Sequence, residues 1–331
     1  GKYPHEHDCW NNHAGLDPGV PTFRDLFDRA GYRTGALGPL DYTAGMHSIR
    51  DQLGSWTRRA GIMRPLSRTP LPQVTEDTTP HAHDWQLKDR AQAWLQEAAG
   101  GDRPFMLYLT TPLVHPAFNA QRKYMDRIDA DKIEIPPTCG DVHGVTHPVE
   151  QYIRVTKNCD TAFSAARVRQ IRHVYYAMIA ELDEIVGEVL RTLDDLGLRE
   201  STHVIFSSDH GEMAGEQNQI LKRTMYEPSV HVPIIVRGPG VAAGGRVQTP
   251  VSLIDLYPTL LDLAGLDYAD YAGADGFAAQ LDGESLVPQL QDDSRPRARD
   301  WAFSEYHGDR CCASTWMLVR GPWKYIRYDG Q

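Results

Sequence analysis

Apolar side chains recur along this chain with two periods, one typical of helices and one typical of buried strands. Between residues 165 and 196 the spacings are four and three, which predicts one long helix with a single core-facing stripe: Ile171, Tyr175, Met178, Leu182, Ile185 and Val189. Shorter helices are predicted at 21–30, 84–99 and 252–264. Asp84 is the expected N-cap of the second of these.

Short apolar runs predict the strands, which lie at 33–37, 105–110, 203–206 and 232–236. Helices that alternate with strands favour an α/β fold with a mostly parallel central sheet. From residue 301 the pattern changes to short amphipathic runs. A small antiparallel C-terminal subdomain is therefore expected, with a hairpin of 316–319 and 323–328. Residues 38–80, rich in Gly, Pro, Thr and Arg, and 140–158, rich in His and Pro, are expected to be irregular.

The composition is that of a globular protein, with 331 residues of which 41% are hydrophobic and 24% charged. The net charge of −10 argues against nucleic acid as a partner. No apolar run reaches the length of a bilayer crossing, so no membrane span is expected. The five cysteines fit no zinc spacing, and Cys139 and Cys159 are either a disulfide or two reduced packing side chains.

Residues suited to chemistry begin just after the predicted 203–206 strand. Asp209 and His210 lie there, and open α/β sheets bind their ligands beyond the carboxyl ends of the strands. A carboxylate suits a hard cation and an imidazole can complete its shell, so this pair is a candidate metal site. The alternative is that Asp209 caps the next helix. Lys222 is a candidate partner for an oxyanion, and its alternative is a solvated surface lysine.

These residues belong to a longer series that resembles the sulfatases, within the alkaline-phosphatase superfamily. Asp209-His-Gly-Glu, Lys222, Tyr226-Glu and Gly238-Pro-Gly follow the family's order, as do the stretches 1–5, 16–23, 30–34, 105–109, 115–118, 232–236 and 251–265. The resemblance implies an alkaline-phosphatase-like sandwich. It also implies a sulfatase-like catalytic domain at 1–295, followed by the start of a C-terminal subdomain at 296–331. Rarer stretches narrow the resemblance to one subfamily: 10–12, 40–48, 147–149, 156–159, 175–178, 304–308 and 313–315.

The resemblance implies hydrolysis of a sulfate ester by a formylglycine and a calcium ion, with a sulfated uronate of a glycosaminoglycan-type glycan as substrate. It assigns Asp209 and His210 to the metal. It assigns Lys222 and His115 to catalysis at the sulfate group, and the alternative for His115, which stands beside Pro116, is that it orders its loop. His47 and His307 are expected to line the glycan subsite, with exposed, satisfied histidines as the alternative. A lysosomal or secreted location is also implied.

Two departures from the family's pattern bear on activity. None of the five cysteines lies in the Cys-x-Pro-Ser-Arg context that yields the formylglycine. We therefore expect the nucleophile, the first acidic metal ligands and a central strand upstream of Gly1 or in a partner chain. The family's Gly-Lys pair appears here as Gly38-Pro39, which removes a cation. Whether this chain is catalytic stays open, and the alternatives are a non-catalytic structural or glycan-binding subunit and a related phosphodiesterase or phosphonate hydrolase.

Overall fold

The computed structural model describes residues 1–7, 16, 19–39, 72–144, 147–274, 276–308 and 311–329. Its α-helices are α1 (Phe23–Arg29), α3 (Ala82–Ala99), α4 (Arg122–Met125), α5 (Pro148–Thr156), α6 (Ala165–Asp195), α7 (Glu227–Val230), α8 (Leu256–Leu263) and α9 (Val287–Gln291). Its strands are β1 (Arg33–Leu37), β2 (Gln73–Thr75), β3 (Phe105–Leu109), β4 (Asn119–Gln121), β5 (Val204–Ser207), β6 (Ile234–Arg237), β7 (Trp301–Tyr306), β8 (Ser314–Arg320) and β9 (Trp323–Asp329). Short 3-10 turns include η1 (Pro4–His7), η4 (Glu216–Asn218) and η5 (Leu253–Asp255).

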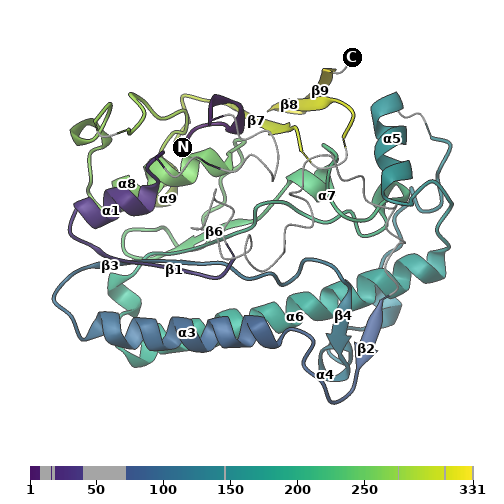
Figure 1. Ribbon diagram of the computed structural model, residues 1–331, viewed down its shortest axis with the longest axis horizontal. Helices are drawn as coiled ribbons and strands as arrows, with labels where there is room; N and C mark the ends of the chain where they lie inside the picture. The colour runs from purple at the N-terminus through teal and green to yellow at the C-terminus, as the bar shows by residue number, and fades with distance from the viewer. Residues whose placement is uncertain are drawn as a thin grey trace.

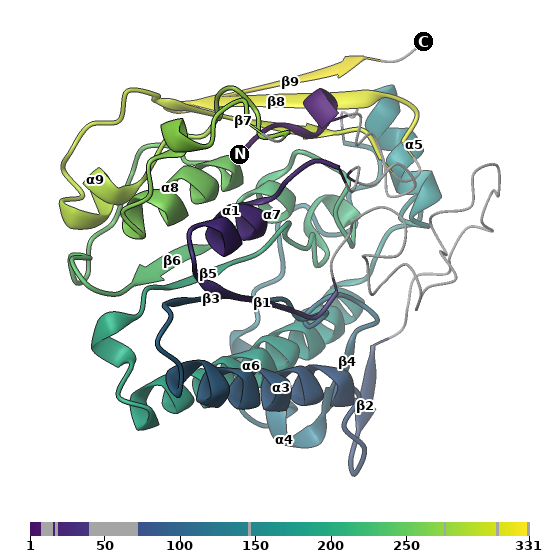
Figure 2. The same cartoon turned by 60° about the vertical axis from the view of Figure 1, so that its left-hand side comes forward.

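Helices cover both sides of the central strands. In Figures 1 and 2, α3 and α6 lie together below β1 and β3, while α1 and α8 lie above them. The sheet β7–β9 forms a further layer at the top of both views. The predicted α/β sandwich with a small antiparallel C-terminal sheet is therefore confirmed.

Two parallel strands bring distant segments to one edge of the sheet. β1 and β3 are parallel, and their register runs from Arg33 opposite Phe105 to Leu37 opposite Leu109. The residues that follow each strand therefore emerge side by side. There the hydroxyl Oγ1 of Thr110 donates to the carbonyl oxygen of Pro39 at 2.8 Å.

Gly38 is required at this edge. Its φ is +97°, and a Cβ atom would lie 2.0 Å from the carbonyl oxygen of Thr110. Only glycine adopts this conformation without steric cost and permits so close a backbone approach.

β5 and β6 are antiparallel, with Val204 opposite Arg237 and Ser207 opposite Ile234. Both strands overlap the predicted ranges. The segment between them holds η4 and the four-residue helix α7, and no long helix that crosses the sheet. A parallel neighbour requires such a crossover, which explains why this pair runs antiparallel.

The largest apolar cluster forms along α6, as the predicted stripe requires. Ile171 and Met178 are fully buried and pack in one cluster with Phe118 and Tyr124. Burial of a large apolar side chain stabilises the fold by about 1.5–3 kcal/mol. The helix begins at Ser164, whose hydroxyl accepts a hydrogen bond from the backbone N–H of Arg167 at 3.2 Å.

Three local predictions were wrong. The expectation of irregular structure across residues 38–80 fails at β2, which occupies Gln73–Thr75. Residues 140–158 are not irregular throughout, because α5 occupies Pro148–Thr156. Pro148 stands in the first turn, where proline is favoured, and Val149 and Ile153 are buried one turn apart. Asp84 is not an N-cap either. The cap is His81, and the carboxylate of Asp84 accepts the backbone N–H of Leu113 at 3.0 Å.

The C-terminal sheet has the order β7-β8-β9 with antiparallel pairing, and its β8–β9 hairpin confirms the predicted one. A buried ion pair lies just before it, where the guanidinium of Arg297 contacts the carboxylate of Asp255 at 3.0 Å. Asp255 also accepts the backbone N–H of Ser252, so this carboxylate links the start of the α8 region to the chain before β7. The domain division at 295/296 stays a prediction.

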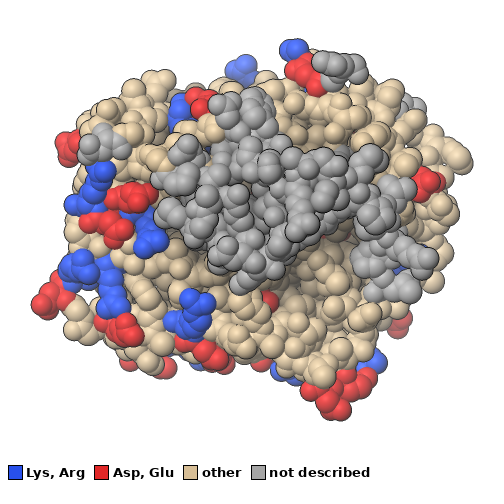
Figure 3. All heavy atoms as spheres, in the orientation of Figure 1, with Lys and Arg blue, Asp and Glu red and all other residues tan. Residues whose placement is uncertain are grey.

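Charged side chains on the face in Figure 3 are mixed in sign around the rim, without one large patch of a single sign among the described residues. Within the described ranges, no helix is both long and apolar enough to cross a membrane. Cys139 and Cys159 are free thiols, as are Cys311 and Cys312. The alternative of reduced packing cysteines therefore holds for the first pair.

Candidate active site

Three predicted site residues meet beyond the ends of β3 and β5. The Lys222 Nζ atom lies 2.9 Å from Nε2 of His115, and the ring centroids of His115 and His210 are 6.3 Å apart. His115 follows β3, His210 follows β5, and Lys222 lies on the loop between β5 and α7. The fold thus gathers residues from separate segments at the edge where the strand ends predict a site.

Hydrogen bonds fix the state of His115. Its Nδ1 atom lies 2.6 Å from the carbonyl oxygen of Pro116, which can only accept, so Nδ1 carries the hydrogen. Nε2 then presents its lone pair to the ammonium of Lys222. Burial, followed by the charge of Lys222, lowers the pKa of His115 to about 4. The pair therefore holds one positive charge at neutral pH, and that charge is on Lys222.

His210 and Asp209 present two acceptor atoms to each other. Nδ1 of His210 donates to the carbonyl oxygen of Gly211 at 2.9 Å, so Nε2 carries a lone pair, and it lies 3.3 Å from Oδ2 of Asp209. Burial, followed by the charge of Lys222, lowers the pKa of His210 and favours its neutral form. Two lone pairs at this separation repel each other unless a cation shares them, so the donor set fits a metal ion.

This pair forms part of a metal shell and not a whole one. Within the described ranges, no group of three or more His, Cys, Asp or Glu side chains converges as metal ligands do. A hard cation such as calcium takes about six to eight oxygen ligands, so residues other than Asp209 and His210 have to supply the rest.

Gly211 follows the pair for a steric reason. Its backbone N–H donates to the carbonyl oxygen of Ser229 at 2.8 Å, and a Cβ atom on it would lie 2.0 Å from the carbonyl oxygen of Pro228. The backbone at this glycine therefore approaches α7 more closely than a residue with a Cβ atom allows. It fixes where the chain turns after His210.

His307, one of the two histidines predicted for the glycan subsite, packs against the C-terminal sheet. His307 follows β7, its side chain is 4% exposed, and its Nε2 is 3.2 Å from the carboxylate of Glu305. Its ring packs edge-on against Trp316 with centroids 4.6 Å apart. His47 lies outside the described residues. The assignment of both histidines to a glycan subsite stays a prediction.

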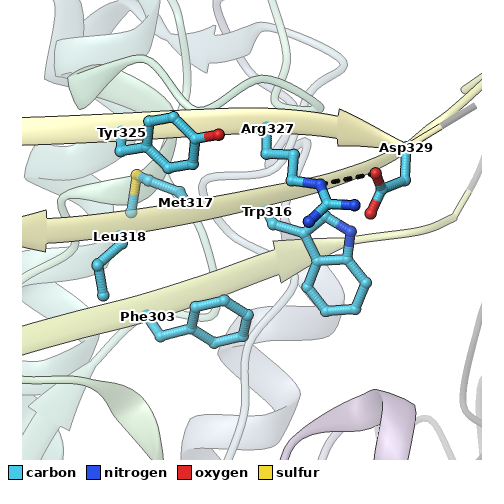
Figure 4. A pocket seen from close by; sticks show the side chains of 7 residues that line it. All are labelled: Phe303, Trp316, Met317, Leu318, Tyr325, Arg327 and Asp329. Carbon is cyan, nitrogen blue, oxygen red and sulfur yellow. Dashed lines mark hydrogen bonds and ion pairs between the residues drawn. The ribbon is translucent and has the colours of Figure 1, made fainter.

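A hollow of about 410 Å³ lies on the outer face of the C-terminal sheet, and Figure 4 shows its lining residues: Phe303, Trp316, Met317, Leu318, Tyr325, Arg327 and Asp329. It is an open, largely apolar surface that none of the predicted site residues lines. Trp323 and Tyr325 on β9 are 79% and 64% exposed. We do not assign the chemistry of the site to this hollow, because no ionisable group of the Lys222–His115 cluster faces it.

Sequence reasoning missed a set of buried polar residues behind Lys222. Glu212 and Lys157 are 9% and 2% exposed, and Gln219 is fully buried. Glu212 stands within the Asp-His-Gly-Glu motif and Lys157 within the stretch 156–159, yet no pattern in the sequence assigns either residue a role. A glutamate and a lysine in loops are ordinarily solvated, and only the tertiary structure reveals their burial.

Comparisons with known proteins agree with this fold and site. The profile described as Sulfatase matches residues 1–266, and the profile described as N-sulphoglucosamine sulphohydrolase, C-terminal, matches residues 215–331. Arylsulfatase K of Bos taurus is 37% identical over 352 residues, covering 99% of this chain and 63% of its own length. The chain thus spans somewhat less than two thirds of this relative. The predicted narrowing to one subfamily is confirmed by this similarity.

Solved structures share the fold at lower identity. A phosphonate monoester hydrolase from Silicibacter pomeroyi superposes with a TM-score of 0.74 at 21% identity, covering 99% of this chain and 75% of that one. BT4656, solved in complex with its substrate D-glucosamine-2-N,6-O-disulfate, superposes with a TM-score of 0.72 at 19% identity, covering 99% and 77%. The match to residues 1–266 covers most of the chain, and on that basis the protein belongs to the sulfatase family.

Proposed function

We propose that the protein is a sulfuric ester hydrolase whose substrate is a sulfated uronate in a glycosaminoglycan-type glycan. The observation that carries the proposal is the Lys222–His115 contact at 2.9 Å beside the Asp209–His210 pair. This arrangement supplies a fixed cation next to a candidate metal site, which is what a sulfate group requires. The substrate class rests on similarity to arylsulfatase K and is the finer part of the proposal.

Lys222 is the residue that would hold the sulfate. Its ammonium donates to Nε2 of His115, and in the proposed function it would also donate to oxygen atoms of a bound sulfate. His115 in turn is held by Pro116, so the direction of the ammonium is set before a ligand arrives. A preorganised cation of this kind stabilises negative charge that develops when the ester bond breaks.

Asp209 and His210 would hold part of a metal shell, and calcium is the ion we propose, with a formylglycine as the nucleophile. When bound, the ion and the formylglycine would supply charge neutralisation at the sulfate oxygens and the attacking group. The oxygen donor of Asp209 suits calcium, while the nitrogen of His210 is a less usual calcium ligand. The residues of this chain would bind and orient the sulfate.

Two other functions remain candidates. A phosphodiesterase or phosphonate hydrolase would use the same cation and the same metal pair, because phosphate and sulfate oxyanions have similar geometry. A non-catalytic glycan-binding or structural subunit is favoured by Pro39, which stands where the family's pattern has a lysine. A sulfated glycan as partner is common to the first and third functions. A partner chain and a lysosomal or secreted location remain proposals.

The test is an assay of the purified full-length protein, with the segment expected to carry the nucleophile, on 2-sulfated glucuronate and on an aryl phosphate, each with added calcium and with a chelator. We expect calcium-dependent release of sulfate that exceeds release of phosphate. Higher turnover of the aryl phosphate would favour the phosphodiesterase. Binding of the sulfated glycan without release of sulfate would favour the non-catalytic subunit.

A further inference from the structure

Lys222 lies in a backbone that local preferences do not favour. The residues on either side of it, Leu221 and Arg223, have φ values of +65° and +88°. For non-glycine residues each such conformation costs about 1–3 kcal/mol and persists only where the surroundings enforce it. The loop between β5 and α7 therefore requires stabilising contacts that hold Lys222 against His115. Two buried residues, Glu212 and Lys157, supply such contacts, and we call them the anchoring residues.

Glu212 is the first anchoring residue. Its Oε1 atom accepts the backbone N–H of Leu221 at 2.5 Å and that of Ala214 at 3.1 Å. Backbone pairing between Met213 N and Leu221 O at 3.1 Å closes the same loop. A buried carboxylate thus bonds the residue immediately before Lys222, and this fixes where the lysine side chain starts.

Lys157 is the second anchoring residue and lies outside the loop. Its Nζ atom donates to the side-chain oxygen of Gln219 at 2.9 Å, and both residues are buried. The next residue back, Asn218, is bonded to the same neighbouring segment, with its amide donating to the carbonyl oxygens of Cys159 and Thr161 at 2.9 and 3.0 Å. The loop is therefore tied to residues 157–161 only two or three positions before Leu221.

The two anchoring residues are an acid and a base, and both lie in one buried region. Burial lowers the pKa of Lys157 to about 7, and the nearby carboxylates of Glu212 and Glu150 offset part of this shift. Leaving either charge buried without the other is costly. Such an arrangement is expected where a strained loop has to be held in one conformation.

We propose that Glu212 and Lys157 are positioning residues for Lys222, holding the 211–225 loop so that the lysine ammonium meets an oxyanion bound beside His115. Neither residue touches the ligand. The inference rests on the proposed role of Lys222 as the sulfate-holding cation. It adds the residues that give this cation its place.

The experiment measures the dissociation constant of inorganic sulfate by calorimetry for the wild-type protein and four variants. Lys222→Met removes the cation and is expected to weaken sulfate binding roughly tenfold, the effect of one charge-assisted hydrogen bond. Glu212→Ala and Lys157→Met are expected to weaken it about three- to tenfold. Glu212→Gln keeps an oxygen that can accept both backbone N–H groups, so its affinity should stay within about twofold of wild type.

A matched control separates positioning from general loss of stability. Glu181 is also a buried carboxylate with two partners, Trp85 and His81, but it lies on α6. Glu181→Ala should lower the melting temperature as Glu212→Ala does and leave sulfate affinity unchanged. The double variant Glu212→Ala/Lys222→Met should bind no more weakly than Lys222→Met, because the two residues act through one cation.

The outcomes distinguish the two levels of proposal. If wild-type protein binds no sulfate, the proposed function is wrong. If wild type binds and Lys222→Met weakens binding while Glu212→Ala and Lys157→Met do not, the positioning role is wrong. Should Glu212→Ala fail to fold, Lys157→Met decides the matter, because methionine fills the same space without the charge.

Discussion

Nζ of Lys222 lies 2.9 Å from Nε2 of His115, and this contact joins residues 107 positions apart in the sequence. It fixes the tautomer of the histidine and the direction of the ammonium at the same time. Burial keeps the histidine neutral, and the contact adds to this effect, since a second positive charge beside an ammonium is unfavourable.

The first prediction concerns the pKa of His115, which burial and then the charge of Lys222 lower to about 4. In Lys222→Met the neighbouring charge is gone, so the pKa should rise toward the ordinary value of 6.5. Between pH 6.5 and about 4 the unfolded chain binds more protons than the folded one. Stability therefore falls as the pH falls through this window, and it should fall less in the variant. An NMR titration of the His115 ring that gives the same pKa in both proteins would contradict the contact.

The second prediction concerns hydrolysis. In the full-length protein with its nucleophile, Lys222→Met should lower kcat for a sulfate ester by about 10²–10³-fold, the effect of removing one donor aimed at developing negative charge. Its melting temperature should change little, because Lys222 is only partly buried. Lys132→Met is the control, since the side chain of Lys132 is 84% exposed and lies on a separate 3-10 turn, Ala130–Lys132. Equal kcat in Lys222→Met and Lys132→Met would exclude the assigned role.

The third prediction concerns calcium and the Asp209–His210 pair. A ligand that binds the folded state raises the melting temperature, so added calcium should stabilise the wild-type protein. Asp209→Asn keeps the shape but lowers the charge, and it should shift the midpoint of this calcium response at least tenfold upward. Asp183→Asn, an exposed position on α6, should respond as wild type does. An unchanged midpoint in Asp209→Asn would remove this residue from the metal shell.

The fourth prediction concerns the buried amine of Lys157, whose pKa is lowered to about 7, chiefly by burial. The unfolded chain has the ordinary value of 10.5, so between pH 7 and 10.5 it binds more protons than the folded protein. Stability should therefore rise with pH across this window. Lys157→Met should lack this contribution. Urea unfolding at several pH values tests it, and parallel curves for the two proteins would mean that Lys157 is not buried as an amine.

The sequence predicts the periodic elements and the strand-end position of the site, because burial patterns and strand termini are local properties. The stripe on α6 and the position of Asp209 just after β5 follow from residue order alone. α5 was missed because its proline and histidine resemble a loop, although Pro148 stands where a helix begins. The antiparallel pairing of β6 depends on what lies between two strands and not on the strands themselves.

The anchoring residues Glu212 and Lys157 could not be predicted from the sequence, and the reason is a different one. Nothing in the residue types of Glu212 and Lys157 says that they are buried, since both are ordinarily solvated. Their roles follow from hydrogen bonds that hold the loop in which Leu221 and Arg223 have positive φ angles. Both the bonds and the angles depend on the tertiary structure. A search for backbone strain around a candidate cation would have found them in any structure of this loop.

The last prediction concerns Pro39, which stands where the resemblance to the family leads us to expect a lysine. β1 and β3 are parallel, so Pro39 emerges beside Thr110, five residues before His115, and its carbonyl oxygen accepts the Thr110 hydroxyl at 2.8 Å. Pro39→Lys keeps that carbonyl and adds a cation at the same edge of the sheet, so it should tighten the binding of inorganic sulfate several-fold. Stability should change by less than about 1 kcal/mol, since loss of the proline ring acts mainly on the unfolded chain.

Charge is the variable that this experiment isolates. Pro39→Glu places the opposite charge at the same point and should weaken sulfate binding, while Pro39→Ala should leave the affinity near that of wild type. The three variants share the loss of the ring, so a graded order of lysine, alanine and glutamate can only come from electrostatics. If all three bind sulfate alike, position 39 lies too far from the Lys222–His115 cluster to act on it. The absent family lysine would then be no reason to doubt the activity of this chain.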